Sequence, residues 1–157
     1  SYSLYVDTME KWFNEHVDAH WMDLRARLMR LLQEEAELNE IVQLVGMDAL
    51  SAPDRLKLEA SRSIREDFLH QDAFHEVDTY TPLQKQFTMM QLVLDYYDKA
   101  VEALDQGASI EDLVKLPVRE QIGRFKYVQE KNIQAEYEAV LKALSKQIDE
   151  LLQKEDF

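Results

Sequence analysis

The sequence predicts an all-α protein, and two observations carry the prediction. Only 3 Gly and 3 Pro occur in 157 residues, which leaves few turns and argues against a many-stranded sheet. Apolar residues recur every three or four residues along most of the chain, which is the period of an amphipathic helix. We therefore expect a bundle of about six helices that forms a single domain over residues 1–157, with one helix-turn-helix tip projecting from it.

The first half of the chain predicts three helices. A short helix is expected over residues 5–17. A long helix follows and ends at Gly46, because glycine readily adopts the left-handed geometry that closes a helix. A third helix is expected over residues 52–69, because Ser51 and Asp54 have the spacing of a capping box. The apolar stripe of the long helix comprises Trp21, Leu24, Leu28, Leu31, Leu38, Val42 and Val45.

The second half predicts further helices. Thr81-Pro82 is a helix start, with a capping residue before proline, and this helix stops at Gly107. A short helix capped by Ser109 and a segment beginning at Pro117 come next, before a last helix over residues 132–153. The clearest apolar stripe of the sequence belongs to the helix after Pro82 and comprises Leu83, Phe87, Met90, Leu94, Tyr97, Val101 and Leu104.

The turn between the second and third helices is the most informative segment. It is short, and exposing its acidic side chains to solvent at the end of a bundle costs little free energy. We expect the tip, residues 47–54, to lie in solvent. Its only large branched apolar side chain is that of Leu50, which either stays exposed, as single leucines commonly do, or folds back against the start of the third helix.

Composition excludes several function classes. A net charge of −13 repels nucleic acid and anionic membranes, and no apolar stretch approaches the 18 residues that a membrane span needs. No segment matches GxxxxGK[ST], and three scattered glycines do not build a phosphate-binding loop. We therefore expect no nucleic-acid partner, no membrane insertion, no bound cofactor and no catalytic residue in this chain, which by itself is not an enzyme.

Two histidine pairs are candidate metal ligands. His16 and His20 lie four residues apart, a spacing that holds zinc on a helix, but HVDAH is not HExxH. His70 and His75 have acids nearby, without a nucleophile or a defined cleft. We interpret the first pair as exposed residues of a helix and the second pair as residues of a loop, and we therefore expect no bound metal.

Two basic clusters are interpreted as structural. Arg62 lies three residues after Glu59 and four before Glu66, and we expect Arg62 and Arg65 to pair within this helix with the acids Glu59, Glu66 and Asp67. Arg119, Arg124 and Lys126 concentrate positive charge in an acidic chain. They either neutralise local acids, the interpretation we favour, or meet an acidic neighbouring protein.

Three segments resemble the catalytic A subunit of V-type and archaeal A-type rotary ATPases, most closely the bacterial and archaeal branch. These segments are QEEAELNEIVQLVG, IREDFLHQDAFHEVDTYT and LPVREQIGRFKY. The resemblance covers nearly all of this chain but only the C-terminal part of the family's subunit, and the chain lacks an initiator methionine, so we expect a fragment of a longer subunit. The alternatives are a free-standing helical adaptor for protein partners and a small metal-dependent helical enzyme.

The resemblance implies specific roles. It implies that the domain couples ATP turnover to rotation of the central stalk in a proton- or sodium-translocating ATPase, with ATP or ADP and Mg bound upstream. It implies that an aromatic side chain, Phe74 first and Tyr80 second, packs against adenine. It implies neighbouring non-catalytic B subunits and a cytoplasmic position, peripheral to the membrane. The residues implied to contact the central-stalk rotor subunit are Met47, Asp48, Ala49, Leu50, Ser51 and Asp54.

Overall fold

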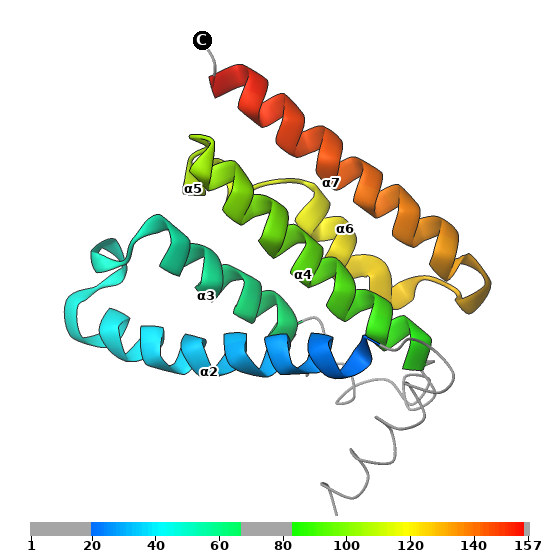
Figure 1. Cartoon of the computed structure of the whole chain (residues 1–157), viewed down its shortest axis with the longest axis horizontal. Coiled ribbons are helices and arrows are strands. Elements are labelled where there is room, and N and C mark those ends of the chain that lie inside the picture. The colour runs from blue at the N-terminus through cyan, green and yellow to red at the C-terminus, as the bar shows by residue number, and fades with distance from the viewer. Residues whose placement is uncertain (1–19, 67–82, 156–157) are drawn as a thin grey trace, which may run out of the picture.

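The computed structural model of the chain describes residues 20–66 and 83–155. Within these ranges the chain is helical and contains no strand, which confirms the all-α prediction. Helices α2, Trp21–Val45, and α3, Ala52–Ile64, form an antiparallel hairpin at one side (Figure 1). Helix α4, Leu83–Asp105, runs through the middle, and α7, Ile133–Glu155, covers the far side. The helix predicted over residues 5–17 lies outside the described residues.

Helix α2, Trp21–Val45, is the long helix that the sequence predicts. It ends at Gly46, whose φ of 90° lies in the left-handed region and whose N–H donates to the carbonyl of Val42 at 2.8 Å. The predicted stripe is buried as far as Leu38. Val45 was placed on that stripe by its spacing, but it is 65% exposed because α2 extends beyond its neighbours at this end.

Helix α3, Ala52–Ile64, begins as its sequence indicates. The Oγ of Ser51 accepts a hydrogen bond from the backbone N–H of Asp54 at 3.3 Å, and proline occupies the first turn. This cap satisfies one of the amide groups that a helix leaves unpaired at its start. The chain continues for one further turn to residue 66, and residues 67–69 of the predicted helix lie outside the described ranges.

Helix α4, Leu83–Asp105, is the centre of the bundle. It packs against α3 on one side and against α7 on the other. The predicted single stripe was therefore incomplete, because a central helix buries more than one face. The additional fully or almost fully buried residues of α4 are Met89, Leu92, Val93, Tyr96, Ala100 and Ala103.

The remaining chain forms two short helices and one long one. Helix α5, Ile110–Val114, is capped by the Oγ of Ser109, which accepts from the N–H of Asp112 at 3.2 Å. Helix α6, Val118–Arg124, follows and continues into a 3₁₀ turn. Helix α7, Ile133–Glu155, begins and ends within two residues of its predicted bounds. The side-chain oxygen of Gln147 on α7 accepts from the N–H of Val118 at 2.9 Å, which ties α7 to the start of α6.

The hydrophobic core has two parts. The main core includes the inner faces of α4 and α7 and the first half of α2, from Trp21 to Leu31. A separate distal cluster, which consists of Leu38, Leu50 and Leu58 with Val42 packed against it, joins the outer half of α2 to α3. Among the described residues, no helix combines the length and apolar character needed to cross a bilayer.

We predict that Tyr96→Phe destabilises the fold. The Tyr96 hydroxyl is buried and donates to the carbonyl of Leu113 at 2.9 Å, so its removal takes away the shorter of two hydrogen bonds to that carbonyl and leaves the N–H of Leu116 at 3.4 Å, at a cost of about 1 kcal/mol. Urea unfolding at neutral pH measures the loss. Tyr127→Phe is the control, because Tyr127 is 66% exposed, and it should change stability little.

The same tyrosine predicts a loss of stability at alkaline pH. Burial raises the pKa of Tyr96 to about 12, from an ordinary value of about 10. The contribution of the neutral phenol is therefore complete below about pH 10 and is lost as the pH rises towards 12. Between pH 8 and pH 11.5, roughly the accessible part of that window, the wild type should lose more stability than Tyr96→Phe. Equal losses would contradict this assignment.

Candidate functional site

The tip is a compact turn at the free end of the α2–α3 hairpin (Figure 1). Residues Met47–Ala49 form one 3₁₀ turn, in which the N–H of Leu50 donates to the carbonyl of Met47 at 3.1 Å. The residues Met47, Asp48, Ala49 and Ser51 are exposed, and Asp54 is half-buried beneath its cap. The turn therefore presents a short exposed rim held by backbone hydrogen bonds.

Leu50 does not lie on that rim. It is 9% exposed and packs with Leu38 and Leu58 in the distal cluster. The expectation of a fully exposed turn is thus wrong at this residue, and the alternative in which Leu50 folds back is the one observed. The reason is that the 3₁₀ turn directs Leu50 between the two helices, where burial of its side chain stabilises the closure of the hairpin.

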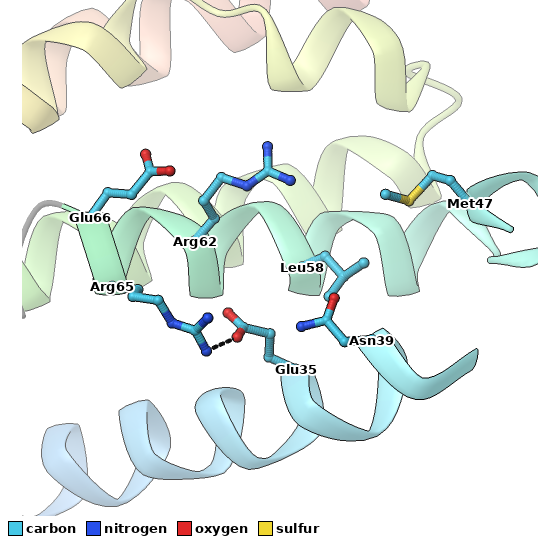
Figure 2. Close-up of a pocket in the computed structure, with 7 residues that line it drawn as sticks. All are labelled: Glu35, Asn39, Met47, Leu58, Arg62, Arg65 and Glu66. Carbon is cyan, nitrogen blue, oxygen red and sulfur yellow. Dashed lines mark hydrogen bonds and ion pairs between the residues drawn. The ribbon is translucent and has the colours of Figure 1, made fainter. Parts of the chain in front are cut away.

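A groove of about 260 Å³ lies beside the tip, between α2 and α3. Figure 2 shows that Glu35 on α2 and Arg65 on α3 face each other within it, and that Met47 reaches towards it from the turn. Glu35 is buried and accepts a hydrogen bond from Arg65. The pairing expected for Arg65 within its own helix is therefore wrong, since it joins α3 to α2 instead. The groove holds paired charges and no nucleophile, which does not favour catalysis.

Arg119 connects the hairpin to the rest of the bundle. Its guanidinium group donates to the carboxylate of Glu59 at 3.0 Å, to the Oγ of Ser63 at 3.0 Å and to the carbonyl of Val114 at 2.9 Å. It also lies 5.4 Å from the centroid of the Tyr96 ring. Arg119 thus neutralises a local acid, as we favoured from the sequence. We call this group of contacts the Arg119 junction.

Two further ion pairs hold the hairpin. Arg27 on α2 donates twice to Asp98 on α4, at 3.0 and 2.6 Å, and this hydrogen bonding raises the pKa of Arg27 above its ordinary value. Arg55 on α3 donates to Glu111 on α5 at 3.0 Å. Both pairs are largely exposed, so each contributes well under the energy of a buried contact. They join the hairpin to the bundle at two points, α4 and α5.

Several sequence-predicted residues lie outside the described ranges, and the structure does not place them. They are His16, His70, Phe74, His75 and Tyr80. His20 is described, and it is exposed at the start of α2. Within residues 20–66 and 83–155, no three or more His, Asp or Glu side chains come together in a way that would hold a metal ion.

Sequence reasoning missed three exposed apolar side chains at the end of α2. Ile41, Leu44 and Val45 are 42%, 84% and 65% exposed. We call them the α2-end patch. Spacing along the helix placed Val45 on the inner stripe, and only the arrangement of the neighbouring elements shows that nothing in the described chain covers the three side chains.

The fold and site define an all-α domain whose projecting hairpin carries an exposed end. The family described as the C-terminal domain of V and A type ATP synthase matches residues 10–114 of this chain. Because that match covers more than half of its length, the chain belongs to this family.

Curated relatives agree with this assignment. Over 99% of its length the chain is 55% identical to the V-type ATP synthase alpha chain of Acetivibrio thermocellus. It is 51% identical, over 98% of its length, to the V-type ATP synthase alpha chain 1 of Clostridium tetani, and 50% identical, also over 98%, to the corresponding alpha chain of Thermoanaerobacter pseudethanolicus. In each case the chain spans 26% of the relative's length.

We predict that Leu50→Ala destabilises the domain by about 2 kcal/mol, because it removes apolar contacts from the distal cluster and leaves a cavity. Leu44→Ala is the matched control, since it makes the same chemical change at a side chain that is 84% exposed. Denaturant unfolding of both variants measures the difference. If the two variants lost equal stability, the burial of Leu50 would not be the cause.

Proposed function

We propose that this chain is the C-terminal domain of the catalytic subunit of a V/A-type rotary ATPase, where it transmits the motion of an upstream nucleotide-binding domain to the central stalk. Its membership of the V and A type ATP synthase C-terminal family carries this proposal. The chain corresponds to 26% of relatives named V-type ATP synthase alpha chain, which favours one domain of a longer subunit over a free-standing adaptor.

The shape of the domain supports a mechanical role. The hairpin is joined to the bundle by the Arg119 junction and by two ion pairs, whereas its tip projects from the end. We propose that this tip contacts the central-stalk rotor subunit. Met47, Asp48, Ala49 and Ser51 are the exposed contact residues, the Oγ of Ser51 caps α3 by accepting from the N–H of Asp54, and Leu50 stiffens the turn from inside.

The other assignments in this proposal concern the whole subunit. ATP or ADP with Mg would bind in the upstream domain, since this chain has no GxxxxGK[ST] segment. Phe74, or Tyr80 in its place, would pack against adenine as a flat ring that needs no hydrogen bond. Non-catalytic B subunits would flank the domain in a ring, on the cytoplasmic side and peripheral to the membrane.

We predict that cysteines at the tip cross-link to the central stalk. Asp48→Cys and Ala49→Cys replace exposed residues, and a photoreactive maleimide attached to either thiol should, on irradiation of the assembled ATPase, cross-link it to the stalk subunit. Gel mobility and mass spectrometry identify the product. Lys154→Cys, an exposed residue near the end of α7, is the control and should not form it. Tip cysteines that cross-linked only within their own subunit would refute the contact.

We predict that Phe74→Ala weakens nucleotide binding to the intact subunit several-fold without abolishing it, since an aromatic packing contact contributes on the order of 1 kcal/mol. Titration of nucleotide into mutant and wild-type subunits of equal thermal stability measures the change. Tyr80→Ala is the comparison. Unchanged affinity in Phe74→Ala together with a loss in Tyr80→Ala would transfer the role to Tyr80.

A further inference from the structure

The α2-end patch is a formed apolar surface. Leu44 and Val45 lie three and four residues after Ile41, so both neighbour it on the surface of α2. All three are at least 42% exposed, and Leu44 is 84% exposed. A single exposed leucine needs no explanation, but a contiguous apolar group at the end of a projecting element is typical of a binding site.

The helix that carries the patch is held in place. The N–H of Gly46 donates to the carbonyl of Val42 at 2.8 Å, which closes the last turn of α2. Val42 is half-buried against the distal cluster and fixes the rotation of that turn. The three exposed side chains are therefore presented on a preformed turn. Because the backbone of this turn is already ordered, binding of a partner costs little conformational entropy here.

The surroundings of the patch are acidic. No Lys or Arg occurs between Arg30 and Arg55, a segment that contains Glu34, Glu35, Glu37, Glu40, Asp48 and Asp54. Glu34 and Glu35 are paired with Lys57 and Arg65 on α3. Glu37, Glu40 and Asp48 are exposed beside the patch.

The end of the helix adds to this charge. The last turn of α2 contains no basic residue, so its carbonyl end contributes a further partial negative charge that no side chain of that turn offsets. A partner complementary to this surface has apolar side chains at its centre and basic side chains at its edge.

We propose that the α2-end patch is the apolar anchor of the rotor contact, and that it docks on an apolar stripe of a central-stalk helix flanked by Lys or Arg. The identity of the partner rests on the proposed function, whereas its chemistry follows from the patch and its acids. The proposal moves the main contact from the turn, residues 47–49, to the end of α2. A patch of three side chains belongs to the class of small, transient interfaces, which suits a surface that must release its partner.

Variants in the assembled ATPase test the proposal, with the cross-link from Ala49→Cys to the stalk as the readout. Leu44→Ala combined with Val45→Ala removes apolar area while alanine preserves the helix. The cross-link yield should fall roughly fivefold, because the anchor is lost. Asp48→Asn should lower the yield by less than about twofold, since an exposed charge at an interface rim contributes little. Met29→Ala is the matched control, because Met29 is 54% exposed on the same helix, and it should have no effect.

The outcomes separate this proposal from the proposed function. If Ala49→Cys cross-links to the stalk and the double alanine variant leaves the yield unchanged, the anchor is refuted and the rotor contact stands. If Ala49→Cys forms no stalk cross-link at all, the rotor contact itself fails. Leu44→Cys tests the occupant directly, and a product with a neighbouring ring subunit or a second copy of this subunit, in place of the stalk, would overturn the proposal.

Discussion

The Arg119 junction is the interaction on which the arrangement of the helices depends. One guanidinium group reaches Glu59 and Ser63 on α3, the last carbonyl of α5 and the ring of Tyr96 on α4. Because Glu59 is only 24% exposed, its charge is tolerated there through its basic partner. The junction joins α3, the helix that follows the tip, firmly to α4 and α6. Beside this link, α3 is held to α4 and α5 by apolar contacts, which do not fix direction, and by the largely exposed Arg55–Glu111 pair at its first turn.

Helix α4 gives the junction a fixed frame. It is buried against α3 and α7 on opposite sides, so it cannot rotate without disturbing both layers of the core. On its α7 side, Asp95 accepts hydrogen bonds from Gln91 at 2.9 Å and from the hydroxyl of Tyr137 at 3.2 Å. Burial raises the pKa of Asp95, and these two donors oppose the rise. Polar pairing at the helix interface thus adds direction to a contact that is otherwise apolar.

Features that depend on residues close in sequence could be predicted from the sequence, whereas contacts between residues far apart in sequence could not. Ser51, Ser109 and Gly46 act through neighbours within four residues, so the caps and helix bounds they predict are confirmed. The partner of Arg119 is 60 residues away, and no spacing rule finds it. The burial of Leu50 and the exposure of Val45 depend on where a second helix stops, which periodicity along one helix does not encode. For the same reason, the sequence located the tip but not the side chains that form its apolar surface.

The division of the core gives the hairpin an asymmetric response to force. Beyond Leu31, roughly 20 Å of α2 extends past the main core at 1.5 Å per residue, whereas α3 remains anchored through Leu56 and the Arg55–Glu111 pair. A load on the end of α2 therefore reaches α3 through the distal cluster and through the pairs that Glu34 and Glu35 make with Lys57 and Arg65. Close-packed side chains resist compression steeply, but apolar contacts separate against only weak, short-ranged attraction. The hairpin therefore resists a force that presses α2 onto α3 more strongly than a force that pulls α2 away from α3.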